Sequence, residues 1–208
     1  MPSPLLDLMY QKRMFLILVF ANLFVQLSIS YYVMIHNDKS PIGHWKLVAI
    51  QVIILILLSI APIPSFMKFI LFSIFSYTFG LLLVHQKEVV DERSIHIAIK
   101  GVLSMFALMM GVGISLMLGG IHLGERFGLF LFVSLLLLIV LRIISIFGNG
   151  LSMLNKALTF ATIMLFSLLI MYDTQNILNR NYKGDFISAS MDYYLDIINL
   201  FVNWLNTD

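Results

Sequence analysis

The sequence has 208 residues, of which 60% are hydrophobic and 12% are charged, and its mean hydropathy is +0.96. A soluble domain of this composition would expose large apolar patches, whereas in a bilayer such side chains can face lipid. The net charge of +2 is not gathered into a basic block, so we expect no nucleic-acid partner. The absence of cysteine excludes disulfides, thiolate metal sites and cysteine nucleophiles.

In chain order, a polar N-terminal segment over residues 1–13 precedes seven apolar segments, which are divided by charged residues, glycines and prolines. The first apolar segment is too long for a signal-peptide core and lacks a small-residue cleavage site, so we expect it to be retained. The pattern predicts an all-α membrane protein, a seven-transmembrane-helix bundle with short loops that forms a single integral membrane domain over residues 1–208. The predicted spans are residues 14–35, 45–61, 65–85, 94–118, 129–147, 156–178 and 187–205.

The distribution of Lys and Arg gives the orientation of the bundle. These residues on the N-terminal side of the predicted membrane outnumber those on the opposite side by one. The positive-inside rule then favours a cytosolic N-terminus. Tyr31, Tyr32 and Trp45 lie where the first hairpin should meet the interface, and Trp204 ends the last span on the same side.

Ionisable side chains inside spans are costly and are usually functional. Snorkelling to the interface is the simplest interpretation of Lys100 and Arg142, because a long side chain can carry its charge out of lipid. Lys68 lies on the same side of the membrane as Asp173 and Asp196 and is the expected basic partner of one of them.

Asp173 and Asp196 are too short to snorkel. Asp173 lies near the end of the sixth span and Asp196 in the first half of the seventh, and a short loop joins these antiparallel spans. At the rise of an α-helix, the two carboxylates lie within roughly 5 Å of each other along the membrane normal. The sequence therefore makes contact between the two carboxylates geometrically available.

The seventh span carries a polar stripe at helical spacing. Such a stripe turns toward the bundle interior or a wet cavity. The alternative is an amphipathic segment that lies in the interface plane, although its polar face carries few cations. The stripe consists of Asp192, Asp196, Asn199 and Asn203.

Two nearby carboxylates in a poorly hydrated place share a proton and titrate as a coupled unit, or they recruit a cation. The protonated pair would hold the last two spans together. A hard cation such as Ca²⁺ prefers carboxylate, amide and carbonyl oxygens, so Asp173 and Asp196 are the expected metal ligands. Thr174, Gln175, Asn199 and Asp192 are the expected supporting polar shell or cation pathway. A pH-responsive latch and a cation site are both compatible with these residues.

The same residues carry a resemblance to a known family. Tyr172-Asp173-Thr174-Gln175 resembles the Y-D-T-Q signature of the Bax inhibitor-1 family, and the segment from Tyr194 to Phe201 resembles its Y-L-D-x-x-N-L-F signature. Residues 127–133 and 144–147 are similar to the family's fifth span and the link before it. The similarity covers the C-terminal half of the chain.

The resemblance implies a seven-span bundle with a cytosolic N-terminus. It also implies a pH-sensitive calcium leak, with Asp173 and Asp196 as a di-aspartyl sensor on the cytosolic side. It places the protein in a bacterial inner membrane, or in an ER or Golgi membrane if the protein is eukaryotic or viral. The chain departs from some relatives, because its second span has no basic residue past Lys46 and because Arg142 stands where many relatives have a small or amide residue.

Three functions compete at this stage. The first is a proton-gated calcium leak channel, with calcium as the transported or bound ion and no cofactor. The second is a non-conducting membrane regulator of cell death or of a membrane protease, which would act through protein interaction. The third, a membrane enzyme, is not expected, because neither aspartate has the Gly-rich context of an intramembrane aspartyl protease and the histidines are scattered. These histidines are His36, His44, His85, His96 and His122.

Overall fold

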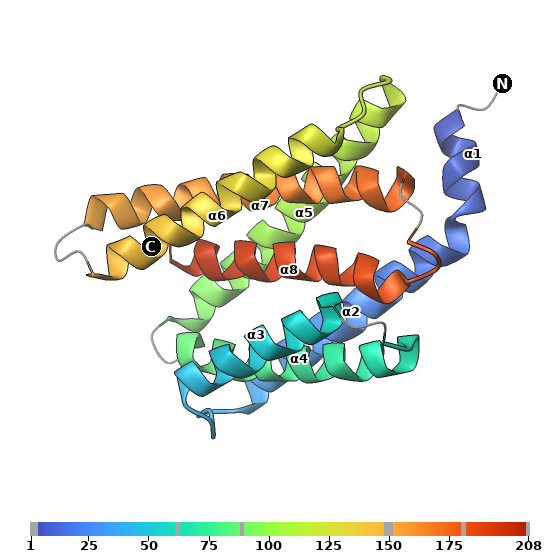
Figure 1. The fold of residues 1–208 in the computed structure, drawn as a ribbon. Helices are drawn as coiled ribbons and strands as arrows, with labels where there is room; N and C mark the ends of the chain where they lie inside the picture. The colour runs from blue at the N-terminus through green and yellow to red at the C-terminus, as the bar shows by residue number, and fades with distance from the viewer. Residues whose placement is uncertain (1–3, 61–62, 88–89, 148–151, 180–181, 207–208) are drawn as a thin grey trace. The chain divides into compact units, whose positions relative to one another are not determined.

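The computed structural model describes residues 4–60, 63–87, 90–147, 152–179 and 182–206. These residues form eight α-helices and no strand (Figure 1). In chain order the helices are α1 (Pro4–Gln11), α2 (Arg13–His36), α3 (His44–Ile60), α4 (Ser65–Lys87), α5 (Glu92–Leu118), α6 (Glu125–Phe147), α7 (Ser152–Asn179) and α8 (Phe186–Leu205). The expected all-α fold is therefore confirmed over the described residues.

The expected number of helices, seven, is wrong, because the described part of the N-terminal segment is helical. The segment, predicted to be polar, forms α1 (Pro4–Gln11). Leu5 of this helix is buried, and its first residue is a proline, where no intrahelical donor is needed. The backbone N–H of Lys12 still donates to Leu8 O at 3.0 Å, and α2 then begins at Arg13. The seven other helices coincide with the seven predicted segments, with ends that differ by at most four residues.

Five of the described helices are long and apolar enough to cross a membrane, namely α2, α4, α5, α6 and α7. α3 is apolar but shorter, with 17 residues. α8 has 20 residues, but its two aspartates and two asparagines keep it out of this group. α6 exposes large apolar side chains such as Phe130, Leu137 and Ile144, as a helix in contact with lipid does. The chain is therefore an integral, multi-pass membrane protein.

Residue contacts divide the chain into two compact units. Unit 1 comprises Met1–Lys12, His96–Asn181 and Leu195–Asp208, and unit 2 comprises Arg13–Ile95 and Tyr182–Tyr194. α5 and α8 run through the division, so each contributes to both units. The single integral membrane domain expected over residues 1–208 stays a prediction.

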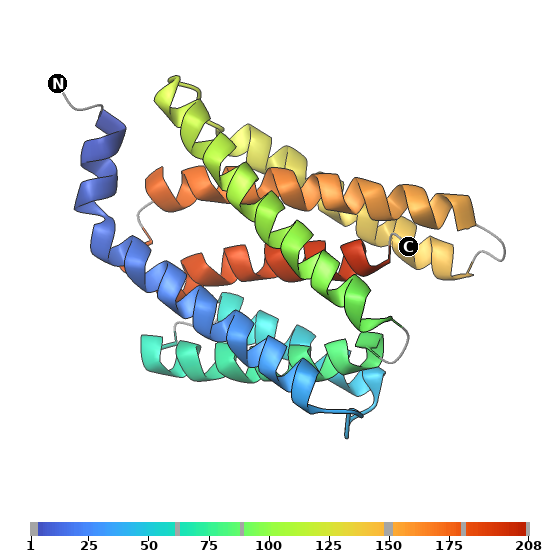
Figure 2. The ribbon, with the colours of Figure 1, turned by 180° about the vertical axis from the view of Figure 1, so that it is seen from behind.

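In unit 2, α4 packs against both α2 and α3, and Figures 1 and 2 show the three helices side by side. Gly80 sets the close approach of α4 to α2, because a Cβ at this position would lie 2.7 Å from Ser30 O and from Val33 Cβ. Phe72, Phe75 and Phe79 of α4 surround the ring of Tyr194, with centroids 5.1 to 6.3 Å from it. The first half of α8 is thus held by an aromatic cluster on α4.

In unit 1, α6 packs along α7, and both views show them as neighbours (Figures 1 and 2). Leu131 of α6 packs with Leu165 and Tyr172 of α7 in one buried cluster. α5 approaches α7 closely at Gly113, where a Cβ would lie 2.8 Å from Met171 O and 3.3 Å from Thr174 Cβ. This contact fixes the part of α7 that carries Tyr172, Asp173 and Thr174.

Candidate functional site

The two aspartates of the predicted pair both belong to unit 1. Asp173 lies on α7, six residues before the helix ends, and is half-buried. Asp196 lies near the middle of α8 and is 4% exposed. Burying a carboxylate is expensive unless a proton, a cation or hydrogen bonds compensate its charge. The structure therefore places at least Asp196 where compensation is needed.

Thr174 and Gln175, expected as part of a polar shell, are both buried and bonded to backbone. The Thr174 hydroxyl donates to Ile170 O at 2.7 Å, within its own helix. Gln175 Nε2 donates to Gly113 O at 3.1 Å and to Ile121 O at 3.3 Å, and its Oε1 accepts from Leu123 N at 2.8 Å. Gln175 thus ties α7 to the end of α5 and the loop after it. Its expected contribution to a cation pathway stays a prediction.

The polar stripe on α8 is present, and its members have different partners. Asp192 Oδ2 accepts a hydrogen bond from the Tyr182 hydroxyl at 3.0 Å. The Asn199 amide donates to Leu195 O at 2.7 Å, and the Asn203 amide donates to Asn199 O at 2.9 Å. The amides therefore satisfy backbone carbonyls of α8 itself.

Arg142 forms hydrogen bonds to other side chains of unit 1, whereas snorkelling predicts only that its charge reaches the membrane interface. One guanidinium nitrogen donates to Thr159 Oγ1 at 2.9 Å and to Asn203 Oδ1 at 2.8 Å. The side chain thus joins the end of α6, the start of α7 and the end of α8. Lys100, the other residue interpreted in this way, is exposed on α5.

Lys68 forms an ion pair with Asp185, which directly precedes α8. Lys68 Nζ also donates to Ser188 Oγ at 3.2 Å. Asp185 caps α8, because its Oδ1 accepts from Ser188 N at 3.1 Å and its Oδ2 from Ser188 Oγ at 2.8 Å. The expected role of Lys68 as partner of Asp173 or Asp196 stays a prediction.

The surroundings of Asp185 favour its charged form. Burial alone would raise the pKa of Asp185, but hydrogen bonds from Lys68 and Ser188 and the charge of Lys68 lower it below its ordinary value of 3.8. The sequence analysis missed this cap, although Asp185-x-x-Ser188 directly before an apolar run is a signal for the start of a helix.

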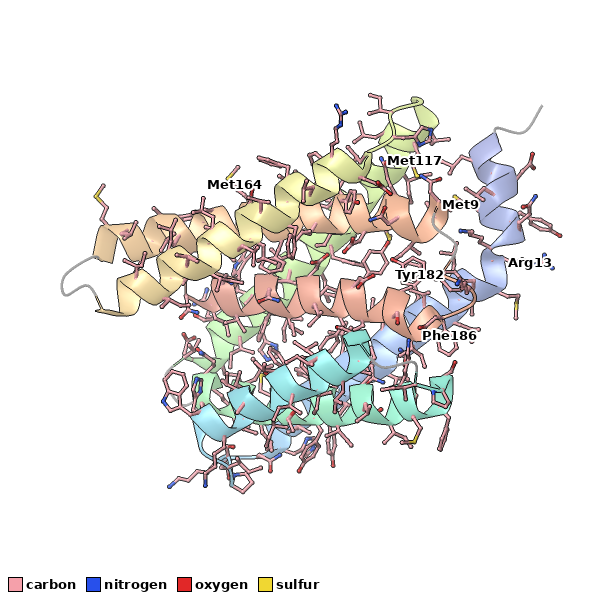
Figure 3. All side chains as sticks on the ribbon, viewed as in Figure 1. Met9, Arg13, Met117, Met164, Tyr182 and Phe186 are labelled. Atoms are coloured by element: carbon pink, nitrogen blue, oxygen red, sulfur yellow. The ribbon has the colours of Figure 1, made fainter. Side chains whose placement is uncertain are left out.

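A tight turn precedes this cap. Asp185 N donates to Tyr182 O at 2.9 Å, and both central residues have positive φ, 52° at Lys183 and 81° at Gly184. The turn brings Tyr182 back over α8, where its ring lies 6.1 Å from that of Phe15 and its hydroxyl reaches Asp192. Figure 3 shows Tyr182 and Phe186 at the start of α8.

A second polar feature, missed entirely by the sequence analysis, lies inside unit 2. Asn22, Gln26 and Ser30 are buried one turn apart on α2. We call their hydrogen-bonded network the polar ladder. Its members are Asn22, Gln26 and Ser30 on α2, Ser73 and Ser76 on α4, and Ser190 and Tyr194 on α8. The sequence signal for this network is the pair of amides Asn22 and Gln26, which lie at i and i+4 within an apolar run.

Each side chain of α2 in the polar ladder reaches another helix. Asn22 Nδ2 donates to Ser190 Oγ at 2.6 Å, and Gln26 Oε1 accepts from Ser76 Oγ at 2.8 Å. The Ser30 hydroxyl donates to Ser76 O at 2.8 Å, which leaves the Tyr194 hydroxyl to donate to Ser30 Oγ across 2.6 Å. Buried polar groups are thereby satisfied in an otherwise apolar interior.

The described residues contain no group of three or more His, Asp or Glu side chains that could hold a metal ion. His44 and His85 form a pair, with ring centroids 5.7 Å apart, at one end of unit 2. A cation at Asp173 and Asp196 would therefore need amide, hydroxyl, carbonyl or water oxygens to complete its ligand shell.

Comparison with known proteins gives a family match over nearly the whole chain. A family model described as "Inhibitor of apoptosis-promoting Bax1" matches residues 8–207. This range covers all the helices from α2 to α8 and both motifs that carry the resemblance noted in the sequence.

Individual relatives match over shorter stretches. An uncharacterized protein of Campylobacter jejuni is 38% identical over 76 residues, which are 36% of this chain and 32% of that protein. Bax inhibitor 1 of Schizosaccharomyces pombe is 38% identical over 81 residues, 39% of this chain and 30% of that protein. An uncharacterized membrane protein of Vibrio cholerae is 36% identical over 77 residues, 37% of this chain and 34% of that protein. The chain thus aligns with about a third of the length of each relative.

Proposed function

The chain belongs to the Bax inhibitor family of membrane proteins, and from that premise we propose that it is a pH-sensitive calcium leak channel gated by Asp173 and Asp196. The observation that supports this proposal best is the burial of Asp196, which is 4% exposed on a helix with a polar stripe. An aspartate that is merely structural would more often lie at a helix end or in water.

The proposed gate works through the charge of the pair. When the two carboxylates share a proton, a hydrogen bond between them holds α7 and α8 together. When the proton leaves, two negative charges repel each other or attract a cation. Ca²⁺ is the proposed cation because the polar groups near the two aspartates in sequence offer oxygen ligands, among them Thr174 and Asn199.

Calcium flux into liposomes that contain the purified protein tests the gate. The open population of a proton-linked gate changes by up to about tenfold per pH unit. We expect Asp173→Asn and Asp196→Asn, which keep the shape of the side chain, to abolish this pH dependence. Asp7→Asn, an equal change at an exposed position on α1, is the matched control and should keep the parent profile.

A parent pH profile in both aspartate variants would refute the gate. Flux no greater than that of empty liposomes, together with co-purification of a stable partner, would favour the non-conducting regulator of cell death or of a membrane protease. The name of the yeast relative, Bax inhibitor 1, is what points to that alternative.

We further propose that the N-terminus is cytosolic, since the positive-inside count favours this orientation. The chain has no cysteine, so a single introduced cysteine is the only thiol in this protein that can react. A cysteine at exposed Tyr10 should react with a membrane-impermeant maleimide only after the cell membrane is opened. Reaction in intact cells would reverse the proposed orientation.

A further inference from the structure

The polar ladder holds α8 at two points one turn apart. Ser190 accepts from Asn22 at 2.6 Å, and Tyr194 bonds Ser30 across 2.6 Å. Gln26 lies between these two contacts on α2 and is locked by Asn22 at 3.3 Å and by Ser76 at 2.8 Å. A helix fixed at two successive turns can neither rotate nor slide without breaking both bonds.

The surroundings of the polar ladder make such movement unfavourable. Asn22, Gln26, Ser30, Ser76 and Ser190 are each at most 4% exposed. The ring of Tyr194 is enclosed by Phe72 and Phe75, which offer no alternative hydrogen-bond partner. A shift of α8 by one residue would therefore leave buried donors and acceptors unpaired in an apolar interior.

The position of Asp196 depends on the same helix. Asp196 lies two residues beyond Tyr194 on α8, which is continuous from Phe186 to Leu205. At about 100° per residue, the Asp192–Asp196 stripe points away from the Ser190–Tyr194 stripe. Any rotation or sliding of the first half of α8 is therefore passed directly to the Asp196 carboxylate.

We infer that the polar ladder sets the rotation and depth of α8 and thereby positions Asp196, an inference that rests on the proposed gating function. Its members are positioning residues. On α2 these residues are Asn22, Gln26 and Ser30. They bind α8 through Ser190 and Tyr194.

Two variants with small changes in volume test the inference. Tyr194→Phe keeps the ring among the phenylalanines of α4 but removes the hydroxyl, and Ser30→Ala removes the acceptor. We expect each to shift the midpoint of the pH profile of calcium flux, with about a two- to tenfold change in flux at the parent midpoint, as the loss of one hydrogen bond allows. Tyr77→Phe, the same change at an exposed tyrosine of α4, should leave the midpoint unchanged.

A distance measurement separates this inference from the proposed function. Spin labels on cysteines at exposed Trp45 and Lys183, both in unit 2, report the placement of the start of α8 relative to α3, because the parent chain has no cysteine of its own. We expect a narrow distance distribution for the parent and for Tyr77→Phe, and a shifted or broadened one for Tyr194→Phe and Ser30→Ala. Parent distributions in both ladder variants would overturn the inference. Unchanged flux in Asp196→Asn would refute the gate, while the distances would still decide whether the polar ladder holds α8.

Discussion

Two helices that begin in unit 2 start with the same cap but in different surroundings. At α5, Asp91 Oδ2 accepts from Ser94 N at 3.1 Å, and Oδ1 accepts from Ser94 Oγ at 2.7 Å. At α8, Asp185 and Ser188 repeat this arrangement, but Asp185 also pairs with Lys68 of α4. Asp91 is exposed, whereas the Asp185 side chain is 25% exposed.

A capping residue can join its helix to another helix as well as accept hydrogen bonds from the first turn. Hydrogen bonds from the side chain and backbone of Ser94 lower the pKa of Asp91, so its charge is stabilised locally. The charge of Asp185 is stabilised locally as well, but its second partner lies on another helix. The cap of α8 is therefore also a tertiary contact, whereas the hydrogen bonds described for the cap of α5 join Asp91 to Ser94 of the same helix.

Removing each cap should give the largest difference between the two sites. Asp185→Ala loses the cap, typically about 1 kcal/mol, together with a charged hydrogen bond, so we expect a loss of roughly 2–3 kcal/mol in the free energy of unfolding. Asp91→Ala should cause a clearly smaller loss. Equilibrium unfolding in mixed micelles measures both, and equal losses would show that Lys68 adds nothing to the cap of α8.

Removing the cation alone should give a smaller effect and should act only at α8. Lys68→Met keeps the length of the side chain and leaves the cap in place, so we expect a loss of about 1–2 kcal/mol at neutral pH. Lys100→Met, at an exposed lysine of α5, is the matched control and should lose little.

The pH dependence of the stability lost in Lys68→Met tests whether the charge of Lys68 causes the loss. The pKa of Asp185 is lower in the folded protein than its ordinary value of 3.8. The ion pair therefore contributes fully above about pH 4–5, and its contribution declines as the pH falls through the folded pKa. The parent and Lys68→Met should converge in stability at low pH. A difference that persists undiminished below the folded pKa would mean that Lys68 stabilises α8 by packing rather than by charge.

The sequence located the helices well but not their partners. Charged residues, glycines and prolines end apolar runs sharply, which is why α2 to α8 coincide with the predicted segments. The helix α1 was missed because it has only eight residues, far fewer than a span needs, although most of them are apolar. Helical periodicity correctly gave the stripe of Asp192, Asp196, Asn199 and Asn203, but it could not show that Arg142 bonds Asn203.

The polar ladder and the cap of α8 show the same limit. Single amides and serines within an apolar run do not prevent the prediction of a span. The sequence therefore predicts the span that contains Asn22 and Gln26 but not the partners of these two side chains. Lys68 was expected to pair with a buried aspartate, because both lie on one side of the membrane. Its observed partner, Asp185, is 117 residues away in a loop, and a separation of this kind is settled by packing rather than by local pattern.

The tight turn at Lys183 and Gly184 constrains how this part of the chain can diverge. Its two left-handed residues let the chain reverse within four positions, so that Tyr182 reaches Asp192 while Asp185 still caps the helix. One inserted residue would move Tyr182 and Asp185 relative to each other and break one of these two contacts. The number of residues from Tyr182 to Asp185 is therefore constrained by the two contacts that this turn makes possible.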